Sequence, residues 1–122
     1  MRKKLLNFPS SIYRNRNKII QELKDCAKRA KKEFPNIQKV ILFGSMARGD
    51  YGLYSDADII IILNKSEHKR YFDRIPKYMD CFISSEIPID IFPYTDKELL
   101  RMKTKGNLFI IKALNEGIEL AK

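Results

Sequence analysis

Residues 57–63, Ala-Asp-Ile-Ile-Ile-Ile-Leu, constrain the fold more than any other part of this sequence. The segment has the length and the β-branched composition of a strand. Because nearly every position is apolar, the strand is expected to be buried on both faces. Such a strand needs helices packed on either side of its sheet, so the sequence predicts a layered arrangement of helices and strands.

Two further segments have the character of short strands. Residues 37–43 are β-branched and apolar, and they lead directly into a Gly-Ser turn. Residues 87–92 are bracketed by Pro88 and Pro93, which favours a strand near the edge of the sheet. The sheet is therefore expected to be small.

Helical patterns alternate with these strands. Apolar residues recur at helical spacing over residues 11–34, and Pro35 ends this helix, whose outer face is basic. Ser66 can cap a further helix that begins at the next residue, and Pro76 should kink or divide it. The inner stripe of this helix is predicted to be Tyr71, Ile75, Tyr78, Met79 and Phe82.

The C-terminal quarter predicts two more helices. Residues 95–98, Thr-Asp-Lys-Glu, fit a capping box at the start of one helix, and Gly106 separates it from a last helix over residues 107–120. The core-facing side of the last helix is predicted to be Leu108, Ile111, Leu114 and Ile118. With 122 residues, the chain is expected to be a single domain over residues 1–122. Its predicted class is α/β (α+β), a mixed sheet of about three to four strands flanked by helices.

The net charge of +9 is concentrated at one end of the chain. Residues 1–32 hold eleven basic and two acidic side chains, whereas residues 33–122 hold thirteen of each. This block fits either an acidic protein or nucleic acid as partner, or simply a solvated helix face. The longest apolar run, residues 59–63, is far shorter than the roughly 20 residues that span a bilayer. A cytoplasmic protein without a membrane segment is expected.

Cysteine and histidine are too sparse for a zinc site of the usual spacing. Cys26 and Cys81 stand far apart, and His68 is the only histidine and is expected on the surface. Free thiols are the favoured state of both cysteines, with a disulfide left open. Any metal ion would therefore be held by oxygen ligands.

Carboxylates supply such ligands. Asp56 and Asp58 lie two residues apart at the entry to a strand, so their side chains point to the same face. Two carboxylates about 4 Å apart repel by roughly 4 kcal/mol at an effective dielectric constant of about 20, and Mg²⁺ is a natural counter-ion. Asp90 lies inside the third apolar strand. If the two strands are neighbours, the three carboxylates could hold two metal ions about 3.5 to 4 Å apart.

A phosphate-binding turn is indicated by residues 44–49, Gly-Ser-Met-Ala-Arg-Gly, in which a short helix is expected to end near Gly49. Gly44 leaves room for a phosphate, Ser45 offers a hydroxyl and a backbone N–H, and Arg48 offers a guanidinium fork. The lysine of a P-loop and the glycine fingerprint of dinucleotide-binding proteins are both absent. Ordinary ATPase and dinucleotide-binding functions are therefore disfavoured.

Taken together, residues 44–49, the segment 55–59 (Ser-Asp-Ala-Asp-Ile) and Asp90 resemble the minimal nucleotidyltransferase (MNT) domains of the DNA polymerase β-like superfamily. The resemblance implies the palm fold of that superfamily and Mg²⁺-dependent transfer of AMP from ATP to a hydroxyl. It implies that Gly44 and Ser45 hold the triphosphate. The implied ligands of two Mg²⁺ ions are Asp56, Asp58 and Asp90. Arg48 would either contact phosphate or brace the turn by pairing with a carboxylate.

Small MNT proteins of this kind are antitoxins that pair with a HEPN-domain ribonuclease toxin, and the resemblance implies transfer of AMP to a tyrosine of that toxin. Two alternatives remain open: transfer to a small hydroxylated molecule, and a non-catalytic nucleotide-binding module. Direct nucleic-acid binding through the basic N-terminal helix is less favoured, and a homo- or hetero-oligomer is left open. Tyr51 and Tyr54 are expected to pack within the loop in preference to stacking on a base.

Overall fold

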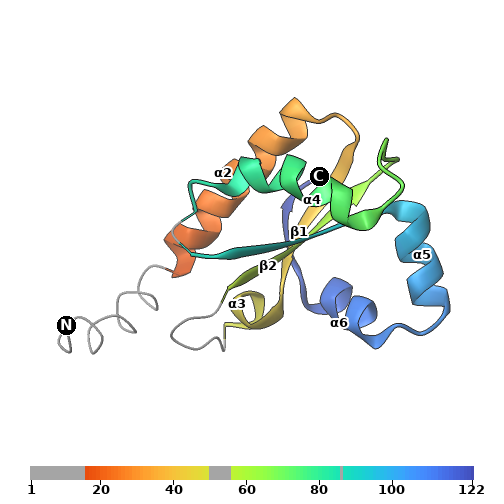
Figure 1. Cartoon of the computed structure of the whole chain (residues 1–122). Helices are drawn as coiled ribbons and strands as arrows, with labels where there is room; N and C mark the ends of the chain where they lie inside the picture. The colour runs from red at the N-terminus through yellow and green to blue at the C-terminus, as the bar shows by residue number, and fades with distance from the viewer. Residues whose placement is uncertain (1–15, 50–55, 86) are drawn as a thin grey trace.

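The computed structural model describes residues 16–49, 56–85 and 87–122. Its centre is a four-stranded sheet in the order β3-β2-β1-β4 (Figure 1). The strands are β1 (Ile37–Phe43), β2 (Ala57–Leu63), β3 (Ile89–Thr95) and β4 (Ile118–Ala121). β1 is antiparallel to β2 and β4, while β2 and β3 are parallel. The predicted class, a small mixed sheet flanked by helices, is confirmed.

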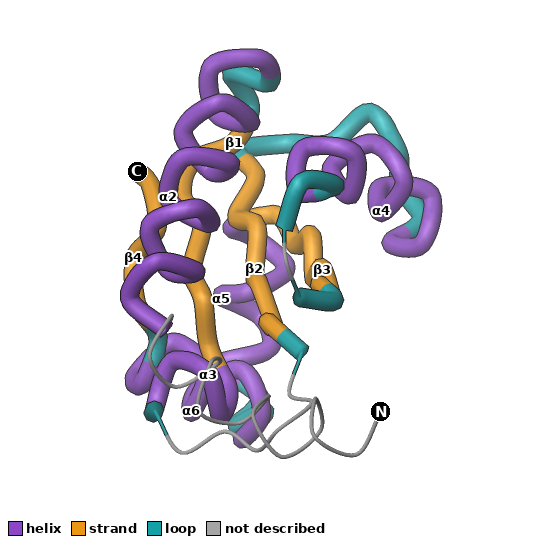
Figure 2. The backbone as a smooth tube through the Cα atoms, turned by 90° about the vertical axis from the view of Figure 1, so that its left-hand side faces the viewer, coloured by secondary structure: helices purple, strands orange, loops and turns teal. Residues whose placement is uncertain are grey.

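Helices cover both faces of this sheet. One face carries α2 (Arg16–Glu33), α4 (Tyr71–Met79) and the 3₁₀ turn η1 (Asp80–Phe82), and the other carries α5 (Asp96–Thr104) and α6 (Leu108–Glu116). In Figure 2, α2 lies over the β1 and β4 side and α4 over the β3 side. The short helix α3 (Gly44–Arg48) follows β1 directly, as predicted. No helix in the described parts of the chain is long and apolar enough to cross a membrane.

β2 is buried on both faces, as its sequence predicts. Ile59 and Ile61 pack into the core beneath α2 and α4, whereas Ile60 and Ile62 pack into the core beneath α5 and α6. Each of these isoleucines is at most 9 % exposed. The bounds of β1 and β2 coincide with the predicted residues 37–43 and 57–63.

The helix that was expected to start after Ser66 begins later, at Tyr71. The Ser66 hydroxyl accepts a hydrogen bond from the backbone N–H of His68 in a local turn. The Arg74 guanidinium then binds the carbonyls of His68 and Lys69, which holds this segment outside the helix. α4 runs through Pro76 without interruption and continues into η1 after Met79.

The predicted last helix is wrong at its C-terminal end. It stops at Glu116, and residues 118–121 form β4 against β1. Gly117 adopts an extended conformation there, and a Cβ atom on it would collide with the side chain of Ile41. The predicted inner face is wrong in part, because Leu108 is 78 % exposed while Ile110 and Ala113 are buried; Leu114 packs against the core as predicted.

β3 is an edge strand, as its flanking prolines indicate, but it continues through Pro93 to Thr95. Its outer edge is occupied by side chains of α4. The Tyr71 hydroxyl lies 3.5 Å from the carbonyl oxygen of Ile91, and Arg74 donates to the carbonyl of Pro93 at 3.0 Å. The predicted capping box is present at the start of α5.

Several other predictions can be placed. Cys26 is a buried free thiol, Cys81 is a half-buried one, and His68 is exposed. Residues 11–15 of the first predicted helix, and the loop that carries Tyr51 and Tyr54, lie outside the described residues.

Candidate active site

Two of the three candidate carboxylates stand side by side in the sheet. Asp58 and Asp90 are each the second residue of their strand, and the parallel register of β2 and β3 pairs them directly. Neighbouring strands lie about 4.8 Å apart, so the two side chains emerge next to each other on the face covered by α5 and α6. Asp56 is exposed and comes immediately before β2. The sheet therefore brings together residues that are 32 positions apart in the chain.

The electrostatics of Asp58 reflect this crowding. Burial raises the pKa of the Asp58 carboxyl, and the neighbouring charges of Asp90 and Asp56 raise it further. The site thus favours a proton or a cation near Asp58, because either would relieve both the repulsion and the desolvation of the carboxylate.

The turn after β1 approaches the same carboxylate. Phe43, the last residue of β1, is paired with Asp58, which places Gly44 beside it. Gly44 has φ +78°, and a Cβ atom on it would lie 2.6 Å from Oδ2 of Asp58. Another residue here would strain the left-handed backbone, and its Cβ atom would displace the Asp58 carboxylate.

A cavity of about 350 Å³ opens between this turn and α6. Its polar lining includes Ser45, Arg48 and Asp58, and α6 contributes Phe109 and Lys112. The sequence reasoning did not identify the two α6 residues as part of the site. Their spacing of three places them on one helix face, which is the one signal that could have found them.

Arg48 forms an ion pair with Glu116 of α6, with Nη1 and Oε2 3.2 Å apart. The pair joins α3 to α6 beside the cavity, which both residues line. Of the two roles that the sequence left open for Arg48, the geometry favours bracing of the turn.

Arg16, at the start of α2, supports the turn from the other side. Its guanidinium donates two hydrogen bonds to the carbonyl of Met46, at 3.1 and 3.0 Å, and one to the carbonyl of Ala47 at 3.0 Å. These carbonyls belong to α3, whose short length leaves its last carbonyls without helical partners. No local sequence pattern indicates this contact, which spans 30 residues.

The donor atoms of the site suit a hard cation. Among the described residues, no group of three or more His, Cys, Asp or Glu side chains is gathered closely enough to hold a metal ion. The adjacent pair of Asp58 and Asp90 nevertheless offers carboxylate oxygens beside a phosphate-sized cavity. Mg²⁺ is commonly bound by one or two carboxylates together with substrate phosphates and water. The residues present therefore fit Mg²⁺ shared with a substrate.

Comparison with known proteins now identifies the family. The model of the nucleotidyltransferase domain matches residues 20–119. The chain belongs to the nucleotidyltransferase family. This match covers the turn and all three candidate carboxylates, and it confirms the resemblance to MNT domains and the expectation of an enzyme.

A curated relative supports the same assignment. The chain is 33 % identical over 104 residues to the "Putative protein adenylyltransferase" of Methanocaldococcus jannaschii, and the match covers 81 % of this chain and 99 % of that protein. The relative is thus similar almost from end to end.

Solved structures share the fold. A crystal structure described as "a putative nucleotidyltransferase from Sulfolobus solfataricus" superposes with a TM-score of 0.63 at 23 % identity, covering 87 % of this chain and 82 % of that one. A chain of a toxin-antitoxin crystal structure with AMP-PNP superposes with a TM-score of 0.53 at 15 % identity, covering 80 % and 72 %. At these identities the likeness establishes the fold.

Proposed function

We propose that this nucleotidyltransferase transfers AMP from ATP to a tyrosine of a HEPN-domain toxin and thereby acts as its antitoxin. The observation that carries the proposal is the pairing of Asp58 with Asp90 beside Gly44, which sets two carboxylates against a turn suited to phosphate. The adenylyltransferase name of the archaeal relative and the nucleotide in the toxin-antitoxin neighbour support the choice of ATP and of a protein acceptor.

The triphosphate would occupy the cavity between the turn and α6. Gly44 leaves room for phosphate oxygens, and Ser45 lines the same cavity. Lys112 adds positive charge on the opposite wall. The ion pair of Arg48 with Glu116 holds the two walls together. The groups that contact the triphosphate would thus already be in position before the nucleotide binds.

The reaction is an in-line displacement at phosphorus. The acceptor oxygen forms a bond to the α-phosphorus, the bond from that phosphorus to the oxygen bridging to the β-phosphate breaks, and pyrophosphate leaves. Asp90 is proposed to take the proton of the acceptor hydroxyl. Asp56 and Asp58, with Asp90, are proposed to hold two Mg²⁺ ions, which would neutralise the charge on the reacting phosphates.

AMP transfer can be tested with labelled ATP. The purified chain is incubated with Mg²⁺ and a lysate of its source organism, using ATP labelled at either the α- or the γ-phosphate, with Asp58→Asn as the control. We expect a protein that is labelled only from the α-position and only by the wild type. Mass spectrometry should then place AMP on a tyrosine of a small helical protein. If the label appears on a small molecule, the acceptor is that molecule and not a protein. If nothing is labelled, the proposal is overturned.

A further inference from the structure

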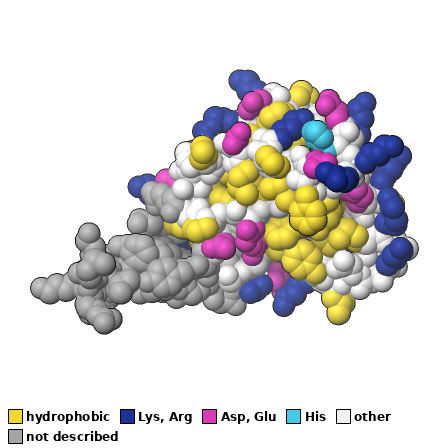
Figure 3. Space-filling model, viewed as in Figure 1, with side chains coloured by type: hydrophobic (Ala, Val, Ile, Leu, Met, Phe, Trp, Pro, Cys, Tyr) yellow, Lys and Arg dark blue, Asp and Glu magenta, His cyan; other side chains and the backbone are white. Residues whose placement is uncertain are grey.

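A strip of large, half-buried side chains runs along β3 away from the candidate carboxylates. Side chains two residues apart on a strand share a face, so Asp90, Phe92 and Tyr94 point to the same side. Tyr94 is four residues from Asp90, about 13 Å along the strand. On the side of the molecule seen in Figure 3, hydrophobic side chains gather next to acidic ones. The β3 strip is defined here as Tyr71, Phe72, Phe92, Tyr94 and Met102.

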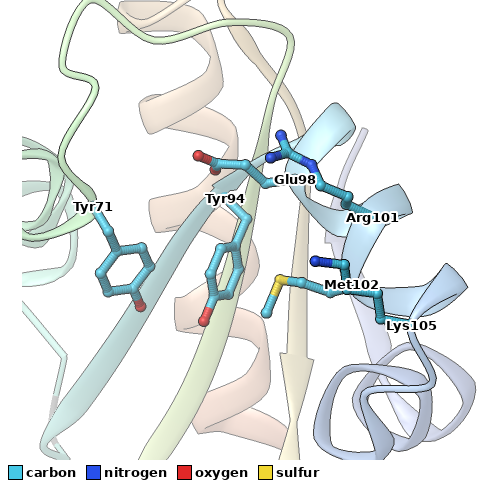
Figure 4. A pocket seen from close by; sticks show the side chains of 6 residues that line it. All are labelled: Tyr71, Tyr94, Glu98, Arg101, Met102 and Lys105. Carbon is cyan, nitrogen blue, oxygen red and sulfur yellow. The ribbon is translucent and has the colours of Figure 1, made fainter.

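The far end of the β3 strip is a shallow pocket of about 250 Å³ (Figure 4). Tyr71 of α4 and Tyr94 of β3 form one wall, with ring centroids 4.9 Å apart, and Met102 of α5 lies beside them. Phe72 extends this wall and is 78 % exposed. Beneath the wall, Arg74 and Glu98 form an ion pair at 2.7 Å that fixes α4 against α5. One wall of the pocket is thus aromatic, and an ion pair links the two helices beside it.

The rim of this pocket is basic. Arg101 and Lys105 of α5 line it, and both are exposed. Among the described residues, no carboxylate lies within ion-pair distance of either side chain. Glu98, the acidic residue of the pocket, is already paired with Arg74. The rim therefore complements negative charge on a bound partner.

The position of the nucleotide cavity indicates where an acceptor enters. The cavity lies on the β1 and α6 side of Asp58, whereas β3 lies on the other side of β2. In an in-line displacement, the attacking and leaving oxygens occupy opposite sides of the phosphorus. With the triphosphate beside Gly44, the acceptor hydroxyl approaches past Asp90, at the near end of the β3 strip.

The rings of the β3 strip favour a protein segment over nucleic acid. Single-stranded nucleic acid stacks its bases on open aromatic faces. Here the rings of Tyr71 and Tyr94 lie against each other, and Phe92 packs against Phe43 and Phe109 at 5.4 and 5.6 Å between ring centroids. These ring–ring contacts take up part of the aromatic surface on which bases would stack, and the surface that is left suits aliphatic and aromatic side chains.

We propose that the β3 strip docks the acceptor protein, through an extended segment that places its hydroxyl at Asp90, its apolar side chains on the strip and its carboxylates against Arg101 and Lys105. The inference rests on the proposed function, because it names the surface that selects the acceptor for that reaction.

Binding and transfer test this inference separately. The probes are a fluorescent peptide in which a tyrosine is flanked by leucines and glutamates, and the same peptide with lysines in place of the glutamates. Binding is measured by anisotropy with the Asp58→Asn protein, and transfer with the active protein and α-labelled ATP. Two variants are compared with the wild type. One is the charge-reversed double variant Arg101→Glu, Lys105→Glu, and the other is Phe72→Ala. The matched control is Ile83→Ala. Ile83 directly follows η1 and is also a large exposed side chain, 83 % exposed.

We expect the wild type to prefer the acidic peptide by about tenfold or more in both assays, and the charge-reversed variant to prefer the basic one. Phe72→Ala should weaken the binding of both peptides several-fold. Ile83→Ala should change the binding of neither. Transfer without charge preference, or binding unaffected by these variants, would overturn the docking surface and leave AMP transfer standing. Charge-selective binding without transfer to any acceptor would instead overturn the proposed function. Tight binding of an oligonucleotide in place of the acidic peptide would make nucleic acid the occupant and refute the inference.

Discussion

The backbone of Gly44 lies against the carboxylate of Asp58, so that a Cβ atom on Gly44 would lie 2.6 Å from Oδ2 of Asp58. Gly44→Ala must therefore displace the candidate metal-binding carboxylate. Since misplacing a reacting group by about 1 Å can cost about 100-fold, we expect kcat/KM for AMP transfer to fall by roughly that factor. Gly106→Ala is the matched control, with a similar φ of +76° but nothing within 4 Å. It should lose about 1 kcal/mol of stability and keep its activity. Equal activity of the two variants would show that the contact is irrelevant.

Asp58→Asn should stabilise the metal-free protein. The pKa of Asp58 is raised in the folded state, so its carboxyl favours folding when protonated and opposes it as pH rises through the folded pKa. We expect the Tm of the variant to exceed that of the wild type at pH 7, and the difference to disappear below about pH 4. Added Mg²⁺ should raise the Tm of the wild type but not of the variant. A lower Tm for the variant at pH 7 would contradict this account.

Arg16 is expected to act as a positioning residue for the nucleotide. Arg16→Ala removes the three hydrogen bonds to the carbonyls of Met46 and Ala47, at a cost of about 2 kcal/mol in stability. Because these bonds hold the turn, KM for ATP should rise more than kcat falls. Arg16→Lys should restore part of the loss, and Arg29→Ala, on the exposed side of the same helix, should change neither constant. A loss of stability with unchanged KM would reduce Arg16 to a structural role.

The ion pair of Arg74 and Glu98 should dominate the acid sensitivity of the fold. Arg74→Met removes the donor to the carbonyl of Pro93 and leaves Glu98 with only the backbone N–H of Thr95, and we expect a loss of about 3 kcal/mol, measured by denaturant unfolding. Arg70→Ala removes only the exposed pair with Asp73 and should leave the midpoint unchanged.

The pH dependence of this ion pair has a definite sign. The hydrogen bond from Arg74 holds the pKa of Glu98 below its usual value. The contribution of the pair is therefore complete above the unfolded pKa of about 4.3 and is lost as pH falls through the folded value. The stability gap between wild type and Arg74→Met should be constant from pH 7 to about pH 5 and should shrink below it. A gap that grows in acid would disprove the assignment.

Local signals were sufficient for the parts of the fold with strong patterns. The bounds of β1 and β2 follow from runs of β-branched residues, and the capping box of Thr95 and Glu98 fixes the start of α5. The pairing of Asp58 with Asp90 required one further assumption, that their strands are neighbours, and β2 and β3 are adjacent.

Non-local contacts explain what the sequence did not reveal. β4 exists because residues 118–121 pair with β1, and the same residues continue a helical pattern when they are considered alone. Arg74 is 2 % exposed, yet nothing near it in the chain predicts burial, since its partners include Pro93 and Glu98. Arg16 binds carbonyls 30 residues away for reasons that only the packing of α2 against the turn reveals.

The occupied edge of β3 limits how this protein can associate. A strand exposes its free edge as a template for another strand, and proteins protect such edges against unwanted growth of the sheet. Here Tyr71 and Arg74 already use the outward carbonyls of Ile91 and Pro93, and Pro93 has no N–H to offer. At these positions another chain cannot extend the sheet by β-augmentation. Recognition at this edge, beside the candidate active site, is therefore expected to rely on side chains, which can discriminate between partners where backbone pairing cannot.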